Sequence, residues 1–100
     1  MALRHGDTLY VRLDYAVEGT ALSQQDYDDH LAYVRGLAAE RFFVGGGCAG
    51  EVGGMCLYEA ESLEEAHEIA ARDPLITRGF YRCEMIAWCV AVSSENGKEK

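Results

Sequence analysis

Segments with strand periodicity and segments with helix periodicity follow one another along this sequence in the order strand, helix, strand, strand, helix, strand. Residues 8–16 alternate with period two and include β-branched and aromatic side chains, which predicts a strand. Ser23 has the side chain of a helix N-cap, and apolar residues then recur at helical spacing until about Arg41. The first half of the chain therefore predicts one strand and one long helix.

The second half continues with a glycine-rich pair of strands. Residues 42–44 begin a strand that runs into the glycines at 45–47, and residues 52–60 predict the strand that pairs with it. Residues 81–92 then predict a long final strand. The two strands around the glycines are close enough in sequence to form a hairpin.

A second helix lies between the hairpin and the final strand. Ser62 and Glu65 have the spacing of a capping box, in which the Glu65 side chain accepts the backbone N–H of Ser62. The helix is expected to end near Asp73, because Pro74 disfavours helical geometry in the residue before it.

This order of elements predicts an α+β fold, a split βαβ antiparallel sheet with two helices on one face. The final strand is apolar on both sides, with Met85 on one side and Ile86 and Trp88 on the other. Two helices cover only one face of the sheet. The exposed apolar face predicts a homodimer formed through the sheets, with a small-molecule site in the cleft between sheet and partner.

Length and charge exclude several classes of function. The 100 residues predict a single domain over residues 1–92 and a disordered polar tail over residues 93–100, which contains both lysines, Lys98 and Lys100. The formal net charge is −8, which argues against nucleic acid or an anionic membrane as a partner. Because the folded part contains no lysine, we expect neither a Schiff-base lysine nor a phosphate-loop lysine.

The spacing of the cysteines and the absence of long apolar stretches indicate in which cellular compartment the protein is expected. The chain has no run of signal-peptide length before the first charged residue and no stretch long enough to span a membrane. Its four cysteines contain no C-x-x-C pair, so no metal site is expected. We therefore expect a reduced, cytoplasmic protein.

His30 is the histidine best placed for chemistry. It lies one helical turn before Val34, at the edge of the apolar stripe, and Asp26 four residues earlier is a possible partner. A half-buried imidazole near carboxylates suits general acid–base catalysis. A structural histidine is an equally open interpretation of the pattern.

Asp73 is the second unusual residue. A carboxylate at a helix C-terminus faces the negative end of the helix dipole, at a cost of a few tenths to about 1 kcal/mol. Asp73 either forms a turn with Pro74 or is held there to orient a histidine or to bind substrate. A pair between His30 and Asp73 would fix the imidazole tautomer, as orienting carboxylates do in catalytic triads.

Further candidates surround this pair. Arg12 or Arg82 is expected to hold a substrate carboxylate. Glu84 and Trp88 share one face of the final strand; Glu84 is either a salt-bridge partner of Arg82 or Arg12, or a ligand-binding carboxylate. The candidates expected to shape the pocket are Trp88 and the glycines Gly45 and Gly46.

Short motifs spread over residues 8–92 resemble one known family, the YciI-like, or YCII-related, proteins. The motifs that carry the resemblance are residues 29–34 (DHLAYV), Gly45, 53–54 (GG), 59–66 (EAESLEEA), 73–75 (DPL), Gly79 and 84–88 (EMIAW). The resemblance implies a ferredoxin-like fold that forms a dimeric α+β barrel, with His30 and Asp73 as the active site. The chain departs from the family by carrying Gly46 where a proline commonly follows the first glycine.

The wider superfamily includes muconolactone isomerases and chloromuconolactone dehalogenases, which move protons without a cofactor. The resemblance therefore implies a cofactor-free lyase or isomerase that acts on a small organic acid. Two alternatives are open. One is a non-catalytic homodimeric module that binds a small molecule or assists another protein. The other, a cofactor-free monooxygenase of the same barrel type, has no specific support in the sequence.

Overall fold

The computed structural model describes residues 6–50 and 52–94, and within these ranges it contains four strands and three helices. The strands are β1 (Thr8–Ala16), β2 (Phe43–Gly47), β3 (Gly54–Tyr58) and β4 (Tyr81–Cys89). The helices are α1 (Gln24–Glu40), α2 (Leu63–Ala71) and α3 (Pro74–Thr77). The predicted tail, with both lysines, lies outside the described residues from residue 95 onward.

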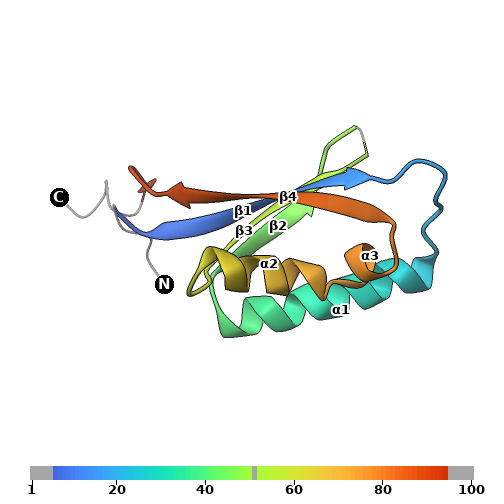
Figure 1. Ribbon diagram of the computed structural model, residues 1–100, viewed down its shortest axis with the longest axis horizontal. Coiled ribbons are helices and arrows are strands. Elements are labelled where there is room, and N and C mark those ends of the chain that lie inside the picture. Colours follow the sequence, from blue (N-terminus) through green and yellow to red (C-terminus); the bar gives the residue numbers. More distant parts are fainter. Residues whose placement is uncertain (1–5, 51, 95–100) are drawn as a thin grey trace.

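The strands form one antiparallel sheet in the order β2-β3-β1-β4, and the helices lie along one of its faces (Figure 1). This arrangement confirms the predicted split βαβ, ferredoxin-like fold. The long helix α1 and the pair α2 and α3 run beneath the sheet as a second layer (Figure 1). In the described part of the chain, no helix is both long and apolar enough to cross a membrane.

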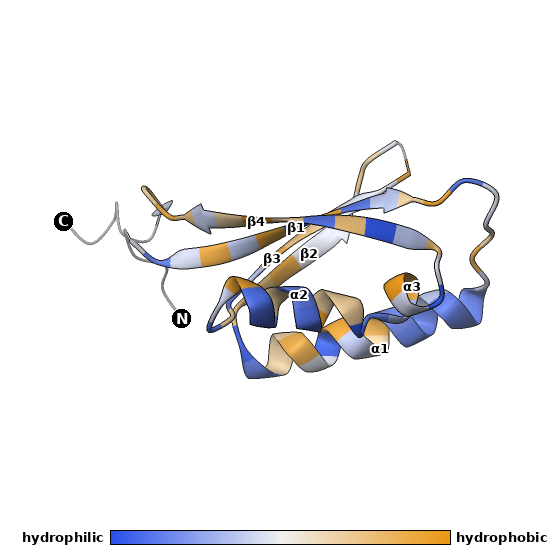
Figure 2. Ribbon diagram, viewed as in Figure 1, coloured by the Kyte–Doolittle hydropathy of each residue, from blue (hydrophilic) through white to orange (hydrophobic). Residues whose placement is uncertain are grey.

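The pairing register decides which side chains face the helices. Arg12 of β1 lies opposite Cys56 of β3 and Met85 of β4, so these side chains share one face of the sheet. The buried core forms between this face and the helices, and its buried members are Tyr10, Leu37, Cys56, Tyr58, Ala66 and Ile69. On α1, Leu37 is the one buried residue. Figure 2 shows how hydrophilic the N-terminal end of α1 is.

The opposite face of the sheet is apolar and is not covered by the helices. Its exposed side chains include Val44, Met55, Ile86 and Trp88. We call these four residues the outer apolar face.

The capping hydrogen bonds at the starts of α1 and α2 differ in one respect from those predicted. At α2 the Ser62 hydroxyl accepts the N–H of Glu65 at 3.0 Å, as predicted. The Glu65 carboxylate, however, accepts the N–H of Glu61 at 2.8 Å rather than that of Ser62. Both halves of a capping box occur instead at α1, between Ser23 and Asp26.

Asp73 directly follows the C-terminal end of α2, as predicted, but its side chain caps a second helix. Arg72 is the C-cap of α2, and Asp73 is the N-cap of the short helix α3, which the sequence analysis did not predict. Its carboxylate accepts the N–H of Leu75 at 2.9 Å. The dipeptide Asp73-Pro74 was the missed signal, because an N-cap Asp followed by Pro at the first helical position is typical of a helix start.

Two predicted strands are shorter in the structure. The strand expected over residues 52–60 is paired over Gly54–Tyr58, and the one expected over 81–92 ends at Cys89. Cys89 pairs with Thr8, the first residue of β1, so β4 ends where its antiparallel neighbour begins.

We predict that Tyr58→Phe lowers the free energy of unfolding by about 1 kcal/mol, the net value of one hydrogen bond. Tyr58 is fully buried, and its hydroxyl donates to the Ala66 carbonyl at 2.7 Å, which ties β3 to α2. Urea unfolding measures the change. Tyr27→Phe is the control, since this ring is 46% exposed; equal losses in the two variants would contradict the prediction.

Candidate active site

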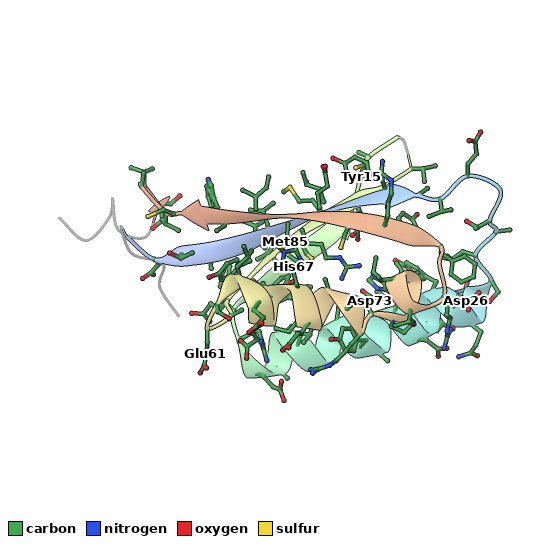
Figure 3. All side chains as sticks on the ribbon, viewed as in Figure 1. Tyr15, Asp26, Glu61, His67, Asp73 and Met85 are labelled. Carbon is green, nitrogen blue, oxygen red and sulfur yellow. The ribbon has the colours of Figure 1, made fainter. Side chains whose placement is uncertain are left out.

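The fold brings His30 and Asp73 into contact. His30 lies on α1, and Asp73 lies where the chain passes from α2 to α3 (Figure 3). The His30 Nδ1 atom is 2.8 Å from Asp73 Oδ2 and 2.9 Å from Oδ1. The pair exists because α3 packs against α1.

Asp73 is a fully buried carboxylate with three neighbouring donors. Besides His30, Arg12 Nη1 donates to Oδ2 at 2.9 Å and the Leu75 N–H donates to Oδ1 at 2.9 Å. Burial by itself raises the pKa of Asp73, but the hydrogen bonds from His30 and Leu75 and the charge of Arg12 outweigh it. The pKa of Asp73 is therefore lowered, and the side chain is an anion at neutral pH.

Arg12 is a buried cation held between two carboxylates. Its side chain is 1% exposed; Nε donates to Asp14 Oδ1 at 2.7 Å and Nη1 donates to Asp73. Burial opposes its charge, but the hydrogen bond to Asp14 and the charges of both carboxylates raise the pKa of Arg12 overall. Among the described residues, none accepts a hydrogen bond from Arg12 Nη2.

A cavity of about 260 Å³ lies between α1 and the sheet. Helix α1 contributes His30 and three apolar or aromatic side chains to its wall, and β1 contributes Arg12 and Asp14. The β2–β3 hairpin lines the cavity with glycines, which leave the backbone uncovered. A Cβ atom at Gly45 would lie 2.8 Å from Cys56 Cβ, so this position requires glycine for steric reasons.

The structure places some of the predicted site residues at this cavity. His30, Arg12, Gly45 and Gly46 line it, and Asp73 lies behind His30. The cavity itself lies between α1 and the sheet, whereas the sequence suggested a cleft between the sheet and a partner chain.

Arg82, Glu84 and Trp88 lie outside this cavity, on the opposite face of the sheet. The register pairs Tyr15 with Arg82 and Leu13 with Glu84, which turns these side chains away from the helices. Glu84 accepts a hydrogen bond from Tyr15 Oη at 2.8 Å rather than pairing with Arg82 or Arg12. Arg82 instead stacks over the Tyr15 ring at 4.7 Å.

Two features of the site were missed from sequence. Asp14 lines the cavity beside Arg12, and its position two residues further along the same strand was the available signal. Arg78 Nη1 bonds Asp26 at 2.8 Å and Asp29 at 2.9 Å, which joins the end of α3 to α1. Asp26 thus bonds Ser23 and Arg78, and the predicted pair of Asp26 with His30 does not form.

This arrangement suits proton transfer. Nδ1 of His30 is tied to an anion, which leaves Nε2 as the nitrogen able to exchange a proton with a ligand. A buried carboxylate in this position orients the imidazole and stabilises the imidazolium that forms. Within residues 6–50 and 52–94, no group of three or more His, Cys, Asp or Glu side chains could hold a metal ion.

Comparison with known proteins identifies the family. The model of the YCII-related domain matches residues 8–88. The chain belongs to the YCII-related family. No curated protein matches its sequence at a significant level.

A solved structure is similar to this chain over most of both chains. It is 5-chloro-2-hydroxyhydroquinone dehydrochlorinase (TftG) from Burkholderia phenoliruptrix AC1100, in complex with 2,5-dihydroxybenzoquinone. The TM-score is 0.69 and the identity 26%, over 80% of this chain and 92% of that one. The family resemblance inferred from the short motifs is confirmed.

We predict that Asp73→Asn lowers the free energy of unfolding by about 3 kcal/mol at neutral pH, because it removes one partner of a buried ion pair. The lowered pKa of Asp73 means that its ionised form favours the folded state above about pH 4, and that this contribution disappears as the pH falls further. Urea unfolding between about pH 3 and pH 7 should therefore show a weaker pH dependence in the variant. The exposed residue Asp28 provides the control, Asp28→Asn; identical pH profiles for wild type and Asp73→Asn would contradict the prediction.

Proposed function

We propose that this YCII-related protein is a cofactor-independent enzyme of lyase or isomerase type that moves protons on a small organic acid. One observation carries the proposal: His30, hydrogen-bonded at 2.8 Å to a fully buried Asp73, lies in the wall of a cavity large enough for a substrate. A neutral imidazole with one nitrogen tied to an anion and the other available is suited to act as a general base and then as an acid.

The residues around His30 have separate roles in this proposal. His30 Nε2 takes a proton from the substrate and returns it at another atom of the same molecule. Asp73 is a positioning residue, because it holds His30 Nδ1 and does not line the cavity itself. Arg12 lines the cavity and supplies a positive charge near an oxygen that becomes negatively charged during the transfer.

The similarity to TftG supports the reaction class and the size of the substrate. TftG is a dehydrochlorinase, which is an eliminating enzyme, and its structure contains a ligand with a single ring. The cavity here measures about 260 Å³. An apolar cavity of about 150 Å³ accommodates benzene, so one substituted ring fits the space beside His30.

A non-catalytic binding module would have a different arrangement of His30 and Asp73. A purely structural pair of His30 and Asp73 would be sealed under side chains. Asp73 is sealed, but the His30 side chain is 18% exposed and lines the cavity. This difference between the two partners favours the catalytic function.

We further propose that the chain forms a homodimer through the outer apolar face. Val44, Met55, Ile86 and Trp88 are each exposed by 45–54% on the side of the sheet away from the helices. Large exposed apolar patches of this kind are typical of association surfaces, and a self-complementary sheet face is suited to two-fold pairing. Arg82, Glu84 and Tyr15 lie on the same side and would then act in association rather than at the cavity.

We predict that His30→Asn lowers turnover by a factor of at least about one hundred. This is the lower end of the range by which a general acid–base residue accelerates a reaction. The assay follows turnover of a panel of small cyclic acids that includes 5-chloro-2-hydroxyhydroquinone. His67→Asn is the matched control, because His67 is exposed on α2 and does not line the cavity. Wild-type turnover by His30→Asn would disprove the assignment.

We predict that Ile86→Asp converts the dimer to a monomer, because it places a charge in the apolar interface. Light scattering after gel filtration measures the mass. Leu63→Asp is the control, since Leu63 is 44% exposed on α2 and Ile86 is 48% exposed on β4. A wild-type mass of one chain, or the same mass for both variants, would count against the proposed interface.

A further inference from the structure

We propose that Arg78 is a positioning residue of the site: it holds the Asp26 carboxylate away from His30, so that Nε2 of His30 stays available to a ligand. The inference rests on the proposed function, in which this nitrogen exchanges protons with the substrate. Arg78 and Asp26 do not line the cavity. Arg78 therefore acts through Asp26 on His30 and not on the ligand itself.

Asp26 is placed to compete with a ligand for His30. It lies four residues before His30 on α1, and side chains at this spacing are neighbours on one face of a helix. Hydrogen bonds from Ser23 and the charge of Arg78 lower the pKa of Asp26, so this side chain is an anion at neutral pH. A carboxylate in this position is a strong acceptor for an imidazole N–H.

Both oxygens of the Asp26 carboxylate are engaged away from His30. Oδ2 accepts the backbone N–H of Ser23 at 3.0 Å and the Ser23 hydroxyl at 2.8 Å. Oδ1 accepts from Arg78 Nη1 at 2.8 Å. The bonds from Ser23 belong to the cap of α1 and stay when Arg78 is removed. Without Arg78, however, Oδ1 would have no donor among the described residues.

The short helix α3 contacts α1 at both of its ends. At its start, the N-cap Asp73 holds His30 Nδ1 at 2.8 Å. At its end, the C-cap Arg78 contacts Asp26 and, at 2.9 Å, Asp29. One end of α3 therefore supplies the partner of Nδ1, and the other end engages the carboxylate that could become the partner of Nε2.

Loss of Arg78 would change the protonation of His30. The released Asp26 carboxylate would accept from Nε2–H and stabilise the imidazolium, so that Nε2 keeps its proton to a higher pH. A histidine protonated at Nε2 cannot take a proton from a substrate. The other charged or titratable side chains around His30 and its cavity are Asp73 at the start of α3, Arg12 and Asp14 on β1, Tyr27 on α1, Cys56 on β3 and Tyr81 on β4.

The test follows the protonation of His30 Nε2 as a function of pH by nitrogen-15 NMR in wild type and in Arg78→Gln. The His30 signals are those that His30→Asn lacks. We expect Arg78→Gln to displace the pH profile of Nε2 upward by roughly half a pH unit, the size expected for one exposed ion pair. An undisplaced profile would overturn the inference.

Arg78→Lys is the conservative variant. A single nitrogen, Nη1, makes both contacts of Arg78, so one ammonium group can replace it. We expect Arg78→Lys to keep the wild-type profile. The Arg78 side chain is 43% exposed, and exposed ion pairs contribute little to stability, so Arg78→Gln is expected to fold. If circular dichroism shows that it does not, Arg78→Met takes its place with the same expected displacement.

Two matched double variants separate the contact with Asp26 from a general effect of charge. Arg78→Gln/Asp26→Ala removes the competing carboxylate and should return the profile to that of wild type. It also removes the capping box of α1, which would add to the damage if Arg78 were merely structural. Arg78→Gln/Asp29→Ala removes the same charge beside His30 and should keep the displaced profile, because adjacent residues on a helix do not face each other. An equal return in both double variants would reduce the effect to charge and overturn the inference.

These NMR profiles are independent of turnover. If His30→Asn leaves turnover unchanged while the profiles behave as expected, the proposed catalytic function fails and the control of Nε2 by Arg78 stands. If wild type turns over a substrate, half a pH unit corresponds to an approximately threefold loss of turnover in Arg78→Gln at a pH below the displaced profile. Asp26→Ala in the same background should then restore turnover, and a further loss would count against the inference.

Discussion

The buried carboxylate of Asp73 is the interaction on which the rest of the site depends. It accepts hydrogen bonds from Arg12 on β1 and from the N–H of Leu75 in α3, and it contacts His30 on α1. An anion without these partners would not remain ionised in a fully buried position. The same contacts that make its burial tolerable therefore hold sheet and helices together and orient the histidine.

The cavity exists because several residues of the β2–β3 hairpin are glycines without side chains. Helix α1 stands over a row of the sheet where β2 and β3 supply glycines, and a side chain at Gly45 would collide with Cys56. The space left by these missing side chains lies beside His30 and Arg12. A chain with larger residues in the hairpin would fill this space and bury the histidine. The glycines thus create the cavity by leaving volume free.

Much of the fold could be predicted from local patterns. The first strand and the N-cap at Ser23 agree with the structure, because alternation and capping depend on neighbouring residues. Asp73 was singled out as unusual, but its role as N-cap of α3 was missed, because a helix of one turn has no periodicity to detect. Arg82, Glu84 and Trp88 were grouped with Arg12, although periodicity within one strand does not reveal which of its sides faces the helices.

The sequence by itself determined the order of the elements, the exposed apolar side of the sheet and the few side chains able to do acid–base chemistry. The tertiary structure decided which of them meet. His30 and Asp73 are 43 residues apart, and Arg12 and Asp73 are 61 residues apart. Their contacts depend on the register between β1 and its neighbours and on the packing of α3 against α1. Local sequence patterns do not encode such distant pairings, because these arise only when separate elements pack around one core.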